Sequence, residues 1–239
     1  MTLPDKENKR EFVQEKFSSV TTKYDFLNSL LSLGIDHLWR KSTIKALSDI
    51  NGPILDLCAG TLPLTKELLK QGHNEVYALD FCYEMLEFGI KKKKQWNLSG
   101  NVYPICADGE KLPFKENVFL GFTVAFGIRN LTDLSKGFSE MFRVLKPGGK
   151  GAILEFSRPT LPFFKQLYRF YLHNILPYIG GMISGDKEAY KYLASSIDAF
   201  YSQKEVCNLL QKAGFENISF KPMSLGIVTL YVCQRPKNE

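Results

Sequence analysis

The stretch "PILDLCAGTLPL", residues 53–64, decides the fold of this chain of 239 residues. It begins as an apolar run, continues through an acid and two small residues, and reaches a Gly-Thr pair. A short buried strand that runs through a tight turn into a helix is typical of nucleotide-binding α/β units. Leu62 and Pro63 stand where a glycine and a small polar or acidic residue would be expected. Three interpretations follow: a working cofactor loop, a degenerate one, or a turn that only resembles one.

Strands and helices alternate on the carboxyl side of this loop. The pattern predicts strands at 53–57, 75–80, 102–108, 119–127 and 151–156, and helices at 64–72, 84–96 and 134–149. After residue 200, Ser202 and Glu205 form a capping box that opens a helix ended by Gly214. Two closing strands, 217–222 and 226–235, should pair as an antiparallel edge. Short apolar strands alternating with helices predict an α/β fold with a doubly wound, mostly parallel, seven-stranded sheet.

The chain divides into four segments. Residues 1–50 predict an N-terminal helical arm or cap, and residues 51–157 the α/β core that binds the cofactor. Residues 158–200 interrupt the alternation with an aromatic-rich insertion, which predicts a helical lid. Residues 201–239 return to the core as its last helix and closing strands.

Composition and charge narrow the classes of function. Hydrophobic residues make up 44% and charged residues 23%, as in ordinary globular proteins. A net charge of +6 is too mild to indicate nucleic-acid binding, so no nucleic-acid partner is expected. The first residues are charged and no apolar run reaches 18 residues, so neither a signal peptide nor a transmembrane helix is expected. Five cysteines without a secretory signal indicate the reducing cytoplasm.

Three cysteines recur at equal intervals. Cys58, Cys82 and Cys106 are each 24 residues apart, one per strand–loop unit, and could converge near the cofactor. The sequence offers no C-x-x-C pair and no nearby histidine for them. Packing as small apolar residues is the preferred interpretation, and no metal site is expected.

Three acids lie at the carboxyl ends of successive predicted strands. Asp56, Asp80 and Asp108 close the first three predicted strands, where parallel sheets bind ligands. Asp80 follows Asp56 by 24 residues, close to the roughly 20-residue spacing at which an acid meets a ribose diol. Each acid taken alone could instead be a helix cap or a turn residue. With one loop glycine and no phosphate-binding motif, the pattern favours a ribose without a pyrophosphate, as in S-adenosylmethionine.

The chain resembles a known family, the ubiquinone/menaquinone-biosynthesis C-methyltransferases (demethylmenaquinone methyltransferases). The resemblance runs from about Tyr24 to Val232. Five blocks carry it: "YDFLNSLLSLGIDHLW" (24–39), "DGEKLPF" (108–114), "FGIRNLTD" (126–133), "RVLKPGGKGAILEFSRP" (143–159) and "YKYLASSI" (190–197). The first and third of these are specific to the family, whereas the glycine loop is shared by many methyltransferases.

The resemblance implies a class I, Rossmann-like methyltransferase that uses S-adenosyl-L-methionine. It implies cofactor contacts for the residues that match the family's binding positions: Asp56, Gly60, Thr61, Asp80, Asp108, Gly109 and Ala125. Asp80 would hold the ribose, while Asp108 and Gly109 would contact the adenine. Ala125 falls where relatives carry a serine, so it would keep backbone contacts and lack a hydroxyl.

The reaction implied is C-methylation of a prenylated hydroquinone, most simply demethylmenaquinol to menaquinol. A ring phenol must lose its proton so that the ortho carbon can attack the methyl group. Arg129 and Asn130 are expected to be catalytic, Arg129 by stabilising the phenolate and Asn130 by orienting the hydroxyl. His37 is the alternative proton acceptor. A structural ion pair with a cleft acid is the alternative role for Arg129.

The predicted lid and the acceptor leave further alternatives open. The lid either packs on the sheet or also lines a tunnel for the isoprenoid tail and touches the bilayer, which predicts transient membrane contact at the inner face. A ubiquinone-type or other aromatic acceptor is the alternative substrate. A non-catalytic, lipid-binding relative is the alternative function, and a homodimer is compatible with the sequence.

Overall fold

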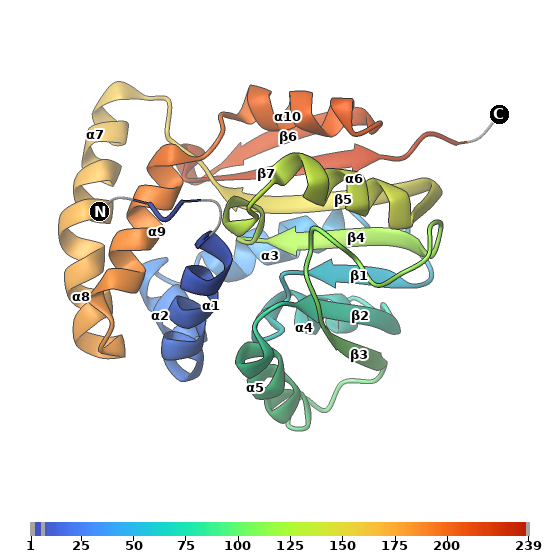
Figure 1. Cartoon of the computed structure of the whole chain (residues 1–239), viewed down its shortest axis with the longest axis horizontal. Coiled ribbons are helices and arrows are strands. Elements are labelled where there is room, and N and C mark those ends of the chain that lie inside the picture. Colours follow the sequence, from blue (N-terminus) through green and yellow to red (C-terminus); the bar gives the residue numbers. More distant parts are fainter. Residues whose placement is uncertain (1–2, 6–7, 238–239) are drawn as a thin grey trace.

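A computed structural model describes residues 3–5 and 8–237, so residues 1, 2, 6 and 7 of the predicted arm lie outside it. Seven strands form one sheet in the order β3-β2-β1-β4-β5-β7-β6, as Figure 1 shows. Strands β1 to β5 run parallel, whereas β7 is antiparallel to both β5 and β6. Their bounds are β1 Ile54–Leu57, β2 Glu75–Asp80, β3 Asn101–Cys106, β4 Phe119–Ala125, β5 Leu145–Phe156, β6 Glu216–Met223 and β7 Val228–Gln234. The predicted α/β fold with a mostly parallel seven-stranded sheet is confirmed.

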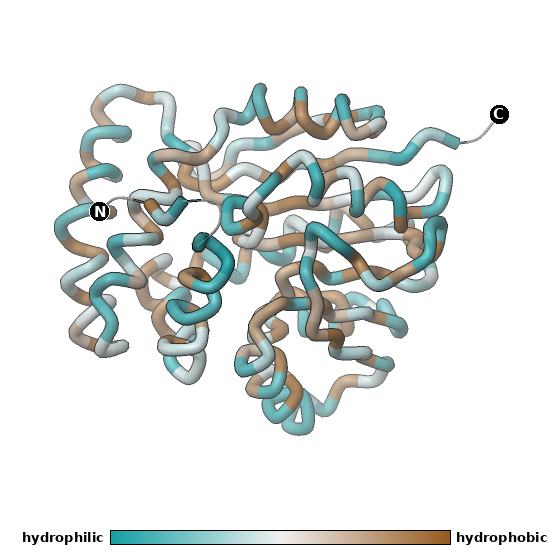
Figure 2. The backbone as a smooth tube through the Cα atoms, in the orientation of Figure 1, coloured by the Kyte–Doolittle hydropathy of each residue, from teal (hydrophilic) through white to brown (hydrophobic). Residues whose placement is uncertain are grey.

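Helices cover both faces of the sheet because alternate strand residues are apolar on each side. Leu55 and Leu57 of β1 face α6 (Leu134–Val144) and α10 (Gln203–Lys212) in one buried cluster. Ile54 faces the other side, where α3 (Asp36–Lys45) and α4 (Pro63–Lys70) pack, with α5 (Tyr83–Lys93) beside them. In Figure 2 the strands are mostly brown, that is hydrophobic, while the outer turns of the helices are teal.

The predicted lid is a helical layer with a core of its own. It comprises α7 (Pro162–Phe170), a π-helical segment (Tyr171–Ile175), α8 (Leu176–Ser184) and α9 (Lys187–Ala199). Leu27 of α2 (Tyr24–Leu31) packs into this core with Leu172, Leu176 and Ile197. In Figure 1, α7 and α8 stand at one end of the molecule with α2 beside them. The N-terminal helix α1 (Lys9–Val20) runs between this layer and the sheet.

Several boundaries differ from the predicted ones. The helix predicted at 134–149 ends at Val144, and the Pro-Gly-Gly run lies inside β5, where the pairing with β4 shifts register. The third strand ends at Cys106, so Asp108 lies two residues beyond it. Asp56 lies one residue before the end of β1. The capping box of Ser202 and Glu205 is confirmed, with both of its hydrogen bonds present.

Candidate active site

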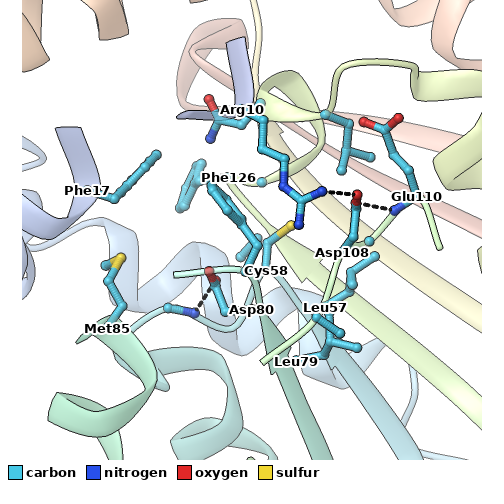
Figure 3. Close-up of a pocket in the computed structure, with 18 of the residues that line it drawn as sticks. Arg10, Phe17, Leu57, Cys58, Leu79, Asp80, Met85, Asp108, Glu110 and Phe126 are labelled. Atoms are coloured by element: carbon cyan, nitrogen blue, oxygen red, sulfur yellow. Dashed lines mark hydrogen bonds and ion pairs between the residues drawn. The ribbon is translucent and has the colours of Figure 1, made fainter. Parts of the chain in front are cut away.

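A cavity of about 260 Å³ opens at the carboxyl ends of β1, β2 and β4. Figure 3 shows Asp80, Asp108 and Leu79 on one side of it, with Arg10 and Phe17 of α1 on the other. We call it the first cavity. Five of the predicted cofactor residues line it: Gly60, Asp80, Asp108, Gly109 and Ala125. The predicted catalytic residue Asn130 lines it as well.

Asp80 is buried at the end of β2, facing the glycine loop. Its carboxylate accepts hydrogen bonds from the backbone N–H of Gly60 at 2.8 Å and of Cys82 at 2.9 Å. Burial raises the pKa of Asp80 to about 6, against the opposing effect of these donors. Each carboxylate oxygen still has a lone pair to accept from a ligand hydroxyl.

Asp108 lies across the first cavity and is held by the N-terminal helix. Its two oxygens accept from the backbone N–H of Glu110 and from Nη1 of Arg10, both at 2.8 Å. Figure 3 shows the Arg10 side chain extending to Asp108. Helix α1 thus covers the first cavity, with Arg10 as one of its attachments.

The unusual loop residue Leu62 points away from the first cavity. Its backbone is left-handed, with φ of 66°, and its side chain is fully buried beside Leu86 and Gly89 of α5. A β-carbon on Gly89 would lie only 2.6 Å from Cγ of Leu62, so the two helix–loop partners fit closely. Pro63 occupies the first turn of α4, where its missing N–H costs nothing. The departure at 62–63 therefore does not fill the first cavity.

Thr61 and Asp56 lie behind the glycine loop. The Thr61 hydroxyl donates to Asp25 of α2 at 2.5 Å, and Asp25 also pairs with Lys92 of α5. Asp56 accepts from the hydroxyls of Thr65 at 2.6 Å and Thr123 at 2.9 Å. Burial raises the pKa of Asp56 to about 6. Both residues border a small cavity of about 20 Å³ and neither lines the first cavity.

A second cavity of about 70 Å³ adjoins the first, since Phe17, Tyr24 and Phe126 line both. Its other walls are mostly aromatic and come from the arm, the sheet and the lid: Trp39, Phe156, Tyr190 and Tyr192. Two buried arginines, Arg40 and Arg129, also line it. The pair of cavities thus offers a polar slot with acids and an aromatic chamber with cations.

Arg129 is fixed by an acid that the sequence interpretation did not single out. Glu155, fully buried near the end of β5, accepts from Nη1 of Arg129 at 2.9 Å and from its backbone N–H at 3.1 Å. The guanidinium also donates to the Phe126 carbonyl and lies 5.4 Å from the Phe156 ring centroid. Burial acts to lower the pKa of Arg129, but the charge of Glu155 outweighs it and the pKa is raised. Arg129 is therefore a cation across the physiological range.

Asn130 and His37 have different surroundings. Asn130 lines the first cavity and accepts through Oδ1 from the hydroxyl of Tyr192 at 3.2 Å. His37 lies on α3 with 62% of its side chain exposed, and it lines neither cavity. Its Nε2 contacts the Ser29 hydroxyl at 3.3 Å. The structure does not bring His37 together with the other candidates.

Other contributors to the site had weak sequence signals. Glu155 is an acid in an otherwise apolar strand, "GAILEF", and that irregularity was its only signal. Arg10 belongs to a charged arm that carries no motif.

Of the three cysteines, Cys58 lines the first cavity, Cys82 is buried and Cys106 is exposed. Among the described residues no three His, Cys, Asp or Glu side chains group to hold a metal ion.

Comparison with known proteins identifies the family of this chain. A model of the ubiE/COQ5 methyltransferase family matches residues 4–235. The ubiquinone/menaquinone biosynthesis C-methyltransferase UbiE of Rickettsia felis is 42% identical over 232 residues, which cover 95% of this chain and 94% of the relative. The enzyme of the same name from Rickettsia bellii is 42% identical over 228 residues, covering 93% and 92%.

Solved structures share the fold at low identity. An S-adenosyl-L-methionine-dependent methyltransferase of Methanococcus maripaludis matches with a TM-score of 0.63 and 18% identity, covering 98% of this chain and 95% of its own. A methyltransferase of Thermotoga maritima matches with a TM-score of 0.63 and 16% identity, covering 92% of this chain and 99% of its own. The family match spans nearly the whole chain, and the relatives align over more than nine tenths of both lengths. The chain therefore belongs to the ubiE/COQ5 family of S-adenosyl-L-methionine-dependent C-methyltransferases.

Proposed function

We propose that this C-methyltransferase of quinone biosynthesis acts on a prenylated hydroquinone, and that its acceptor is demethylmenaquinol. The observation that carries the proposal is the second cavity, an aromatic chamber with buried arginines that adjoins the first through Phe17, Tyr24 and Phe126. Aromatic walls favour a flat fused ring, and the cations favour a ring oxygen that becomes anionic. Membership of a methyltransferase family favours the enzyme over the non-catalytic, lipid-binding alternative.

The first cavity fits the cofactor through its donor set. We assign Asp80 to the ribose diol, because a buried carboxylate with free lone pairs accepts from two hydroxyls. Asp108 and Gly109 are assigned to the adenine, in the part of the first cavity that Leu57 and Leu131 line. A β-carbon on Gly109 would lie 3.3 Å from Leu57 and 3.4 Å from Leu131. S-Adenosyl-L-methionine supplies the methyl group as part of a sulfonium.

The remaining cofactor positions are assigned to the methionine end. Gly60, with φ of 51°, keeps the loop backbone close to the first cavity, and Ala125 borders both that cavity and the small one. Thr61 and Asp56 are assigned supporting roles from behind the loop, where Thr61 joins it to Asp25. Through this hydrogen bond α2 holds the position of the loop.

We assign the activation of the acceptor to Arg129 and Asn130. A ring phenol has an ordinary pKa near 10, so a nearby cation that stabilises its anion lowers the cost of deprotonation. Arg129 meets that need as a cation fixed by Glu155, and its raised pKa argues against its acting as the proton acceptor. Asn130, anchored by Tyr192, is placed to orient the hydroxyl. The exposure of His37 argues against it as the acceptor of the proton.

A methyl-transfer assay tests the acceptor. Purified protein is given methyl-labelled S-adenosyl-L-methionine with chemically reduced demethylmenaquinone or with a reduced ubiquinone-type precursor of the same tail length. We expect kcat/KM to be at least about tenfold higher for demethylmenaquinol, which corresponds to about 1.4 kcal/mol of discrimination. The opposite ratio would assign the ubiquinone-type acceptor, and no transfer to either quinol would refute a hydroquinone substrate.

The affinity for cofactor should depend on pH through Asp80. A diol donates well to a carboxylate but poorly to a carboxylic acid, so binding favours the ionised form, and the free protein has a pKa of about 6 there. We expect the dissociation constant of S-adenosylhomocysteine to rise about tenfold for each pH unit below 6 and to level off above it. Calorimetric titration from pH 5 to 8 measures this, and Asp80→Asn should remove the Asp80 part of the slope. An affinity independent of pH would contradict the assignment.

The same pKa fixes the sign of the stability effect. Because the folded pKa of Asp80 lies above its ordinary value of 3.8, its contribution to stability is fully present below pH 3.8 and is lost as pH rises through 6. Asp56, whose pKa is also about 6, adds in the same direction. At neutral pH, where Asp56 and Asp80 are both ionised, the free energy of unfolding of the free protein is therefore lower than it would be with these acids protonated.

We also propose that the lid end of the molecule touches the membrane surface, as the acceptor's isoprenoid tail requires. Large apolar side chains are exposed there on α7 and α8, namely Phe163, Leu167, Phe170, Tyr178 and Met182. Phe26 of α2 and Leu33, which follows α2, are exposed as well. Lys165 and Arg169 lie among them on α7. No helix in the described part of the chain has the length and apolarity to span a bilayer. An exposed apolar surface with basic neighbours suits an interfacial contact with anionic lipid.

Vesicle sedimentation tests this contact. At low salt we expect part of the protein to sediment with vesicles that contain anionic lipid, and the bound fraction to fall several-fold in Phe163→Ser/Phe170→Ser, because apolar area is lost. Phe220→Ser on β6 is the matched control, since Phe220 is also exposed but lies outside the lid. Absence of binding at low salt, or an equal effect of the control, would refute the contact.

A further inference from the structure

Arg40 is a buried cation of the second cavity that has no individual role in the function proposed so far. It lies on α3 with only 4% of its surface exposed, and it lines both the second cavity and the small cavity behind the glycine loop. Its guanidinium carbon is 5.3 Å from the centroid of the Phe126 ring, on the wall shared by the first and second cavities. Arg40 therefore stands where the cofactor and acceptor spaces meet.

The hydrogen bonding of Arg40 is incomplete. Its nearest acid is Asp36, one helical turn earlier, but the 3.6 Å between Nε and Oδ2 is too long for a hydrogen bond. Among the buried side-chain nitrogens and oxygens of the described residues, only Nε of Arg40 and Nε of Arg129 lack a partner. Both arginines line the second cavity. Buried donors without acceptors are costly, so two at one cavity point to a ligand that supplies acceptors.

The charges around Arg40 indicate what kind of ligand fits. Asp56, its other acidic neighbour, already accepts from Thr65 and Thr123 through both oxygens. Besides Asp36, the titratable groups that line the second cavity with Arg40 bring no negative charge in their ordinary forms: Lys16, Tyr24, Arg129, Tyr190 and Tyr192. The small cavity of about 20 Å³ has room for a group about the size of one oxygen atom. An anionic oxygen would satisfy both the space and the charge.

We propose that Arg40 binds an anionic oxygen of a bound ligand at the junction of the cavities. Two groups have this chemistry: the carboxylate of the cofactor's methionine portion, reached past Gly60 and Thr61, and a ring oxygen of the acceptor, reached through the second cavity. The second source rests on the proposed hydroquinone substrate, whereas the first does not. Arg40 is a binding residue in either case, distinct from the assigned role of Arg129.

Two adenosine ligands separate the sources. S-Adenosylhomocysteine carries the carboxylate, and 5′-methylthioadenosine shares its adenosine and sulfur but lacks the amino-acid portion. If Arg40 holds the carboxylate, Arg40→Gln should lower the affinity for S-adenosylhomocysteine about 10- to 100-fold. The affinity for methylthioadenosine should then stay within twofold of the parent value. If it holds the acceptor oxygen, both affinities should stay within twofold while the KM for the quinol rises by a similar factor.

Two further variants control for folding and for charge. Arg235→Gln removes a structural arginine that donates to the carbonyls of Phe142, Arg143 and Leu145 and lines neither cavity, so it should change none of these values. Arg40→Lys keeps the charge and should recover most of the lost affinity. If Arg40→Gln fails to bind methylthioadenosine, whose binding reports an intact first cavity, Arg40→Met replaces it, because methionine also removes the charge. If the folded variant without the charge shows a tenfold loss neither in affinity for S-adenosylhomocysteine nor in KM for the quinol, the proposal is overturned.

The two proposals can fail separately. Ligand affinities are measured without any acceptor, so the carboxylate arm stands even if no quinol is methylated. Conversely, normal turnover of demethylmenaquinol by Arg40→Gln, with unchanged affinity for S-adenosylhomocysteine, would overturn the role of Arg40 and leave the hydroquinone substrate supported.

Discussion

Replacing Glu155 with alanine is expected to lower the free energy of unfolding by about 3–5 kcal/mol and to reduce methyl transfer at least 100-fold. Glu155 is fully buried and is the acid that pairs with Arg129, accepting from both its guanidinium and its backbone N–H. Its removal leaves a buried guanidinium without a counter-charge. The destabilisation comes from that uncompensated charge, and the loss of turnover comes from a displaced Arg129.

A double substitution separates these two effects. In Arg129→Met/Glu155→Leu both charges are replaced by apolar groups, which often restores the stability of a buried ion pair. We expect its unfolding free energy, from urea titration, to return to within about 1 kcal/mol of the parent. Turnover should remain at least 100-fold below that of the parent, because Arg129 no longer stabilises the phenolate. Affinity for S-adenosylhomocysteine should be unchanged, since Arg129 does not line the first cavity.

Two outcomes would contradict this account. If the double variant is stable and turns over at the parent rate, Arg129 and Glu155 form a structural pair and the phenolate is stabilised elsewhere. If Glu155→Ala is stable and active, the buried pair contributes neither to the fold nor to the reaction. Glu155→Gln, which keeps the shape and removes the charge, should lie between the parent and Glu155→Ala in both measurements.

The sheet and part of the site could be predicted because they depend on local patterns. Strand ends carry the acids, and parallel strands bring their ends together, so Asp80, Asp108 and Gly60 meet at one cavity. Asp56 illustrates the limit of that rule. In the register of β1 and β2 it pairs with Ala78, two residues before Asp80, and its side chain turns toward Thr65 of α4. A spacing along the chain does not fix the level at which a side chain leaves the sheet.

The contacts that complete the site link residues far apart in the chain. Arg10 and Asp108 are separated by 98 positions, and Arg129 and Glu155 by 26. Such pairs depend on how α1 lies over the sheet and on which face β5 presents, neither of which a local periodicity encodes. Leu62 is a case in the other direction. It stands where the loop pattern would have a glycine or a small polar or acidic residue, yet a left-handed backbone turns its side chain toward Gly89.

Asp80→Ala is expected to weaken S-adenosylhomocysteine binding about 100- to 1000-fold. A carboxylate that accepts from both ribose hydroxyls makes two charge-assisted hydrogen bonds, each worth about 1.5–3 kcal/mol. The substitution also frees the N–H of Gly60 and of Cys82, which Asp80 holds in the folded chain. Loss of affinity alone would therefore not distinguish a direct contact with the ribose from a disturbed loop.

A ligand that lacks the diol makes that distinction. With the 2′,3′-dideoxy form of S-adenosylhomocysteine, the parent should lose most of the same affinity, because the carboxylate has no hydroxyls to accept from. Asp80→Ala should bind the two ligands equally, within about twofold. If the variant still prefers the diol by more than tenfold, the hydroxyls are held by another residue. Asp80 would then act on the cofactor only through the loop, by holding the N–H of Gly60 that it accepts from at 2.8 Å.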